Sequence, residues 1–264
     1  MAETGQLTQA PIGMPAVSRV TLVRVAIIAT ILVIWEATAA SGLLFRDVVP
    51  SLVVIARAVA NLVVESEFYW HLSVTAGEVG TGLVIGGLAG LVVGIALGGS
   101  RFLSRAFEHF LYYLGPTPKI IFFPVMIMWF GVGPGSKVAM GTISCFFPVA
   151  LSVAAGMRQI DEVLIRVGRS FRANTWQMVT KIYLPAMRAP IVNGVRLGLG
   201  VAIIGTLLAE TKLSNRGVGF LIINSYSTFN MPRMYSLLIV VFVVAIGANA
   251  VVSRFGNLEA IKGR

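Results

Sequence analysis

Six long apolar runs divide the chain, and they constrain its fold more than any other feature. A helix needs roughly 20 mostly apolar residues to cross a bilayer. Each run is about that long and carries few charged side chains. We therefore predict an all-α polytopic membrane protein with six transmembrane helices. The predicted spans are 25–44, 74–100, 106–131, 138–157, 190–210 and 234–253.

The composition excludes the main soluble classes. The apolar types make up 56% of the residues and the charged types only 12%, whereas a soluble domain carries about 25% charged residues. This excludes a soluble enzyme and a disordered chain. A single cysteine, Cys145, excludes a disulfide scaffold. The net charge of +10 does not indicate a nucleic-acid partner, because the basic residues cluster in short loops between apolar runs.

The distribution of Lys and Arg predicts the orientation of the chain. Fourteen of the 21 basic residues fall on the side that holds both termini, and six fall on the other side. Cytoplasmic loops carry the excess of Lys and Arg, so we expect both termini in the cytoplasm of a bacterial inner (plasma) membrane. Residues 1–18 are expected to form a flexible cytoplasmic tail, and 19–264 a single transmembrane domain.

Glycines recur every four residues through the second predicted span. This spacing places them on one helix face that is nearly bare backbone, which lets another helix approach closely. We interpret this glycine stripe as a surface for helix packing and not as the lining of a pore. Its members are Gly82, Gly86, Gly90, Gly94 and Gly98.

The third predicted span holds a lysine, Lys119, between Pro118 and Pro124. Proline bends a helix, and a broken, charged helix in a membrane protein often lines a pathway. The alternative is that Lys119 extends its ammonium group to the membrane surface. In the first case, the residues of a translocation path or gate are Pro118, Lys119 and Pro124.

Other ionisable residues near the span ends are expected to be mainly structural. Glu210 ends the fifth span and could pair with Lys212 or Arg216 or hold the outer loop, and we assign it to the same path or gate. His71 and His109 fall on opposite sides of the membrane in this topology, so they do not indicate a metal site. Outside the spans, we expect short helices in 45–73, starting after Pro50-Ser51, and in 211–233.

The longest inside loop, 157–189, is the most charged stretch of the chain. Helical spacing predicts two short amphipathic helices with a turn at 172–175, the second capped by Asn174 or Thr175 and stopped by Pro185. Such a loop either lies on the membrane surface or docks into a groove of a partner. The apolar positions of the first helix are Ile160, Val163, Leu164, Val167 and Phe171.

This loop resembles a motif of the membrane subunits of binding-protein-dependent ABC importers, in particular the nitrate, sulfonate and taurine group. The motif reads Glu-Ala-Ala, three residues, Gly, nine residues, Ile, one residue, Leu-Pro. Ile182, Leu184 and Pro185 match its end. The departures are Arg166, at the position of the glutamate, and Arg172, at the position of the glycine. The resemblance implies an ATPase-coupling loop formed by Arg166, Val167, Gly168, Arg169, Phe171, Arg172, Ala173, Ile182, Leu184 and Pro185.

The resemblance extends from about residue 50 to 255. Segments similar to that group include Pro116-Thr117-Pro118-Lys119, Trp129-Phe130-Gly131-Val132-Gly133, Ala209-Glu210 and Gly217-Val218-Gly219-Phe220-Leu221-Ile222. It implies a fold like that of a type I ABC importer permease. It also implies import of a small, anionic solute such as a sulfonate, taurine or nitrate.

The resemblance further implies the partners. They are two copies of a cytoplasmic ABC ATPase, a periplasmic or lipid-anchored substrate-binding protein, and a second permease chain in a homodimer. The chain has no GxxxxGK[ST] phosphate loop, so it is not expected to be an enzyme and ATP hydrolysis is expected in a separate subunit. No cofactor is expected. The alternative is a self-sufficient secondary transporter or channel, but no inverted repeat is evident.

Overall fold

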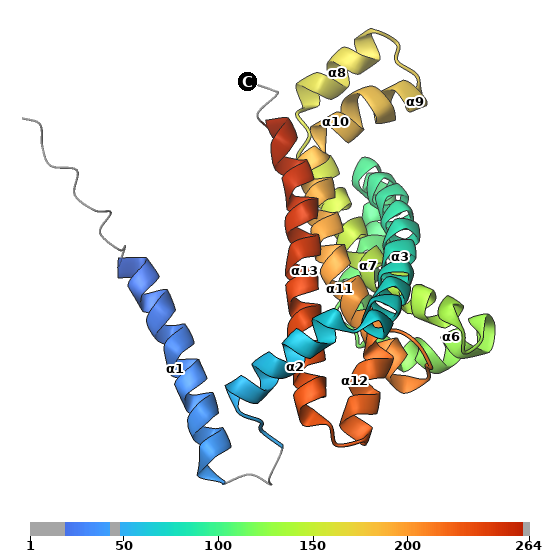
Figure 1. The fold of residues 1–264 in the computed structure, drawn as a ribbon. Helices are drawn as coiled ribbons and strands as arrows, with labels where there is room; N and C mark the ends of the chain where they lie inside the picture. Colours follow the sequence, from blue (N-terminus) through green and yellow to red (C-terminus); the bar gives the residue numbers. More distant parts are fainter. Residues whose placement is uncertain (1–18, 43–47, 261–264) are drawn as a thin grey trace, which may run out of the picture. The chain divides into compact units, whose positions relative to one another are not determined.

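The computed structural model describes residues 19–42 and 48–260, and these residues are helical, with no strand among them (Figure 1). The all-α prediction is confirmed. The chain divides into two units, Met1–Ile55 and Ala56–Arg264, and each is described by itself. The predicted tail, residues 1–18, and the end of the first predicted span, Leu44, lie outside the described residues.

In the first unit, the apolar helix α1 (Arg19–Ser41) is hydrogen-bonded to the segment that leads into α2 (Leu52–Val64). The Trp35 indole N–H donates to the carbonyl of Pro50 at 3.1 Å. The backbone N–H of Leu52 donates to the Glu36 carboxylate at 2.9 Å. Because the first N–H groups of a helix lack partners within it, Glu36 satisfies one of them for α2. The predicted helix after Pro50-Ser51 is confirmed.

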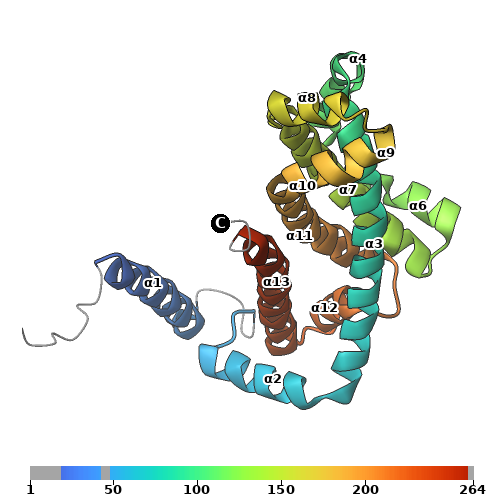
Figure 2. The same ribbon diagram turned by 90° about the horizontal axis from the view of Figure 1, so that it is seen from above.

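The core of the second unit consists of three long helices that lie side by side (Figures 1 and 2). Helix α7 packs against both α3 and α11. The lengths of these helices follow from the apolar runs in the sequence. Their bounds are Ser66–Gly99 for α3, Pro134–Arg158 for α7 and Arg188–Lys212 for α11.

The glycine stripe lies on the face of α3 that meets α7. A Cβ added at Gly90 would lie 2.8 Å from the carbonyl oxygen of Phe146, and one at Gly94 would lie 2.7 Å from that of Ala150. Gly82, Gly86 and Gly98 meet α7 in the same way, whereas Gly87, on another face, has nothing within 4 Å. The backbones of α3 and α7 are therefore too close for any side chain at these positions.

The remaining helices surround this core. α13 packs along α11, and α12 lies between them at one end. The segments between α3 and α7 are α4 (Arg101–Leu103), η1 (Ser104–Glu108), α5 (His109–Leu114), η2 (Lys119–Phe122) and α6 (Phe123–Phe130). Those between α7 and α11 are α8 (Glu162–Ser170), α9 (Thr175–Met178), η3 (Val179–Tyr183) and α10 (Leu184–Ala186). The last two helices are α12 (Val218–Ser227) and α13 (Met231–Ala260).

Five described helices are long and apolar enough to cross a membrane, and a sixth span results if one bent pair is counted as one. That pair, Arg101–Leu114 and Lys119–Phe130, is bent by 94°. The third predicted span, 106–131, is therefore not a continuous helix. The physical reason lies in Gly115–Pro118, where two prolines remove backbone donors and end the first half.

Candidate functional site

The loop α8–α10 projects from one end of α11, and α12 lies at the other end (Figure 1). Two side-chain caps shape it. The Asp161 carboxylate accepts from the N–H of Val163 at 2.8 Å at the start of α8. Asn174 and Gln177 form a reciprocal capping box at the start of α9, with bonds of 2.8 and 2.9 Å. The predicted pair of short helices, with Asn174 as the cap of the second, is confirmed.

One face of this loop is closed and the other is open. Gly168 is buried, and a Cβ there would collide with Ile182 and Met178, so the glycine lets the two helical segments touch. On the open face, Phe171 is 83% exposed and Trp176 is 75% exposed. The other predicted coupling residues are exposed or half-buried, and they are Arg166, Val167, Arg169, Arg172, Ala173, Ile182, Leu184 and Pro185.

The turn between the helices holds a backbone conformation that favours glycine. Arg172 has φ +52°. The N–H of Ala173 donates to the Gly168 carbonyl at 3.0 Å, and that of Arg172 donates to the Arg169 carbonyl at 2.9 Å. These two bonds form a Schellman motif, whose left-handed position is usually glycine. Arg172 therefore occupies the strained position at which the resembling motif has its glycine.

Pro185 does not stop the second helix, contrary to the prediction. The π-helical turn η3 precedes it, and the short helix α10 continues to Ala186. A π turn changes the hydrogen-bond register of a helix. Pro185 thus falls in the first turn of α10, where a missing N–H is tolerated.

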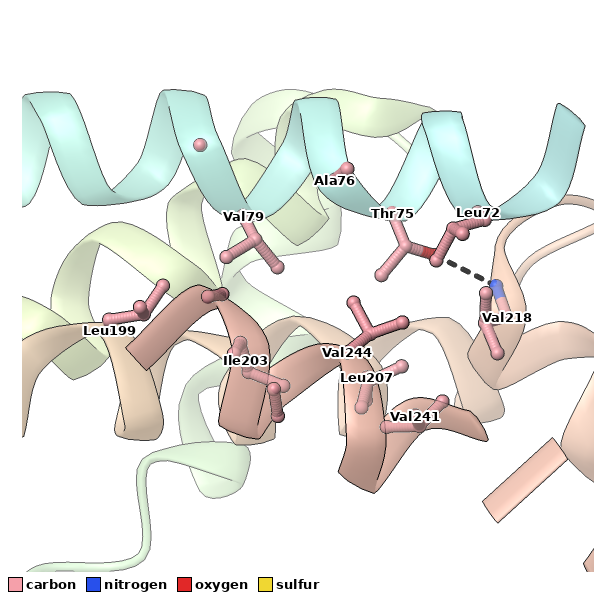
Figure 3. A pocket seen from close by; sticks show the side chains of 13 residues that line it. Leu72, Thr75, Ala76, Val79, Leu199, Ile203, Leu207, Val218, Val241 and Val244 are labelled. Atoms are coloured by element: carbon pink, nitrogen blue, oxygen red, sulfur yellow. Dashed lines mark hydrogen bonds between the residues drawn. The ribbon is translucent and has the colours of Figure 1, made fainter. Parts of the chain in front are cut away.

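At the opposite end, a buried polar cluster holds the start of α12. The Glu210 carboxylate accepts from the Thr75 hydroxyl at 2.7 Å and from the N–H of Gly219 at 2.6 Å. The same Thr75 oxygen accepts from the N–H of Val218 at 2.8 Å (Figure 3). Nδ1 of His71 accepts from the N–H of Gly217 at 3.0 Å. Three side chains from α3 and α11 therefore satisfy three backbone donors at the start of α12.

The predicted ion pair of Glu210 with Lys212 or Arg216 is not formed among the described residues. Glu210 is fully buried, and it bonds instead to Thr75 of α3 and to the start of α12, within the predicted outer segment 211–233. The buried cation nearby is Lys137, 1% exposed, whose ammonium donates to the carbonyl of Leu213 at 2.8 Å. Thr75 and Lys137 were not predicted as site residues, because helical periodicity carries no signal for their bonds to the distant residues Glu210 and Leu213.

An apolar pocket of about 200 Å³ adjoins this cluster, between α3, α11 and α13 (Figure 3). Its walls are formed by side chains such as Val79, Leu199 and Val244. The hydroxyl of Thr75, at one end, is already hydrogen-bonded. The pocket therefore presents no free charged group that would hold a polar solute.

The bend after α5 holds the predicted path residues. Pro124 lies in the first turn of α6, and Pro118 precedes η2. The Lys119 ammonium donates to the carbonyls of Gly115 and Thr117. This break holds three of the predicted path or gate residues, Pro118, Lys119 and Pro124. The fourth, Glu210, lies in the separate cluster at the start of α12. Among the described residues, no group of three His, Cys, Asp or Glu side chains could hold a metal ion.

Comparison with solved structures shows the fold. The chain matches an inward-facing methionine ABC transporter with a TM-score of 0.61 and 19% identity, over 78% of this chain and 96% of the other. The predicted resemblance to a type I importer permease is confirmed for the fold.

Comparison with characterised sequences shows the family. The chain is 30% identical over 216 residues to an aliphatic sulfonates transport permease protein of Bacillus subtilis, which covers 82% of this chain and 78% of the relative. It is 31% identical over 158 residues to a taurine transport system permease protein of Escherichia coli, or 60% and 58% of the two chains. Both relatives are named as permease proteins. Residues 82–258 match the family described as the inner membrane component of binding-protein-dependent transport systems, and the chain is a multi-pass member of that family.

Proposed function

We propose that this chain forms half of the membrane pathway of an importer for a small anionic solute, such as a sulfonate, taurine or nitrate. The names of the sulfonate and taurine relatives support this class of solute. We further propose that α8–α10, within the loop 157–189, couples transport to a separate cytoplasmic ATPase.

The open face of α8–α10 carries this proposal. Two large aromatic side chains, Phe171 and Trp176, are mostly exposed at the end of a closed, capped helix pair. Aromatic residues of this kind are the usual anchors of protein interfaces. This arrangement favours docking of the helix pair into a groove of a partner over a position flat on the membrane surface.

The charge of this loop predicts the character of the partner. Arg166, Arg169 and Arg172 are all exposed in it. Complementary charge guides association and suppresses wrong partners. We therefore propose an unusually acidic groove on the ATPase that receives this loop.

The remaining partners follow from the same assignment. We propose two ATPase subunits, a second copy of this chain in a homodimer, and a periplasmic or lipid-anchored binding protein that delivers the solute at the α12 end. The bias of Lys and Arg supports cytoplasmic termini and a cytoplasmic α8–α10. The bend at Pro118, Lys119 and Pro124 would line the pathway, and Glu210 would act on the gate only by holding α12.

Co-purification tests the coupling role. The tagged chain is expressed with its ATPase, and Phe171→Asp is compared with Phe229→Asp. Phe229 is a matched control, because it is also exposed (55%) but lies in the turn after α12. We expect Phe171→Asp to lower the recovered ATPase by about tenfold or more, as for an interface anchor, and Phe229→Asp to leave it unchanged.

Equal recovery of the ATPase with both variants would remove the docking role of α8–α10. Solute flux by the chain alone in liposomes, without ATP, would instead support a self-sufficient secondary transporter or channel.

A further inference from the structure

Lys119 stands at the 94° bend between two half-helices, with part of its hydrogen-bonding capacity unused. An ammonium group has three N–H donors. Two of them reach the carbonyls of Gly115 and Thr117. The charge also lies 5.2 Å from the centre of the Phe147 ring, within cation–π range. One donor therefore remains for another group.

Lys119 is one of the residues that line a cavity of about 210 Å³ between η2, α7 and α11. Ser144 also lines this cavity, and among the described residues its hydroxyl makes no hydrogen bond. The rest of the wall is mostly apolar, and it includes Met140, Val201, Ile204 and Leu208. The cavity thus combines one cation and one hydroxyl with an apolar surface.

The described part of the chain supplies no counter-charge for Lys119. Its ion pairs join other residues, namely Glu67 with His71, Glu108 with Arg158, and Glu65 with Arg233. A cation inside a membrane-spanning segment is costly unless an opposite charge or water accompanies it. Irregular backbone at membrane depth is tolerated where it lines a cavity.

We propose that this cavity is an anion-binding station of the permeation path, with Lys119 as its charged contact and Ser144 as its hydrogen-bond donor. It would take a solute with one anionic head group and a short apolar body, the chemistry of a small organic sulfonate. This proposal rests on the importer function proposed above, and it adds the contact residues and the shape of the solute.

The competing explanation is purely structural. The Lys119 ammonium caps a carbonyl beyond the C-terminus of α5, which lysine side chains often do. A capping lysine would stabilise the bend without attracting anions into the cavity. A measurement of charge selectivity inside the cavity separates the two explanations, because capping alone does not affect it.

Thiol labelling in the cavity provides that measurement. The full chain, with its ATPase, carries Cys145→Ala to remove the native thiol and Ser144→Cys to place one in the cavity. The rate of reaction is measured with anionic sulfonatoethyl methanethiosulfonate and with the cationic trimethylammonioethyl reagent. We expect the anionic-to-cationic rate ratio to fall about tenfold when Lys119→Met is added, as for loss of a focused charge, and to be retained with Lys119→Arg.

A matched thiol outside the cavity is the control. Asn215→Cys is exposed in the loop before α12, and Lys119→Met should leave its rate ratio unchanged. Ethanesulfonate should slow labelling of Ser144→Cys, uncharged ethanesulfonamide should not, and the protection should disappear with Lys119→Met.

An unchanged rate ratio with Lys119→Met, or equal protection by both compounds, would overturn the anion station and leave Lys119 as a helix cap. Recovery of the ATPase in the same preparations tests the importer function separately. Failure of that function is thus distinguished from failure of the station.

Discussion

The two ends of α11 carry polar groups in opposite ways. At the α12 end, Glu210 and Thr75 are buried and hydrogen-bonded to the chain itself. At the α8–α10 end, Arg166 and Arg169 are exposed, and Phe171 is 83% exposed beside them. Polar groups that satisfy one another fix a local structure, whereas exposed charges and aromatic rings are available to a partner. The α12 end therefore uses its polar groups to hold the fold, whereas the α8–α10 end leaves charged and aromatic side chains available to a partner.

The largest expected effect is loss of the buried cluster. Glu210→Ala leaves the N–H of Gly219 and the hydroxyl of Thr75 without their acceptor. Each buried donor that loses its partner costs about 1–3 kcal/mol, so we expect a loss of about 2–4 kcal/mol in stability. The measurement is the apparent melting temperature in detergent.

The control is Glu67→Ala on α3, since the Glu67 side chain is 66% exposed. We expect it to change stability by less than about 0.5 kcal/mol. Similar melting temperatures for the two variants would contradict the view that the α12 end is held by its buried polar groups.

The next effect concerns the scaffold that joins the two ends. Gly90→Val places a branched side chain against the Phe146 carbonyl and Val149 of α7, where even a Cβ lies closer than 3.0 Å. Overpacking of this kind costs about 1–3 kcal/mol. We expect a lower melting temperature and a lower yield of folded protein.

Gly87→Val is the matched control, because nothing lies within 4 Å of a Cβ at that position. It should affect stability far less than Gly90→Val. Equal losses would mean that helix propensity, and not close contact between α3 and α7, decides the cost.

The smallest effect has the opposite sign. An arginine in the left-handed conformation costs about 1–2 kcal/mol in stability, and Arg172→Gly removes that cost. The glycine also makes the unfolded chain more flexible, which offsets part of the gain. We expect a net gain of about 0.5–1 kcal/mol, seen as slower amide hydrogen exchange in α8 and α9. Arg169→Gly, inside α8, should instead speed exchange.

ATPase recovery with Arg172→Gly tests whether the arginine at the strained turn contacts the partner. We expect recovery to be retained, because the exposed aromatic residues and the other arginines remain. A complete loss of recovery would show that Arg172 makes a specific contact with its partner, and that the strain is maintained for binding.

Much of the α8–α10 end was predictable, because its features are local. The capping residue Asn174 lies next to the helix that it caps, and the Schellman turn at Arg172 joins residues a few positions apart. Apolar spacing also predicted the helical pair. The continuation past Pro185 was not predictable, because it depends on the π-helical register of η3.

The apolar spans, the glycine face and the break at Pro118 were predictable, since each depends on neighbours along one helix. The cluster around Glu210 depends on tertiary packing. Its bond to Thr75 joins positions 135 apart, and the bond from Gly217 to His71 joins positions 146 apart. Helical periodicity records which residues share a face, but it does not record which distant face they meet. That choice arises only when α3, α11 and α12 pack and their buried polar groups must find partners.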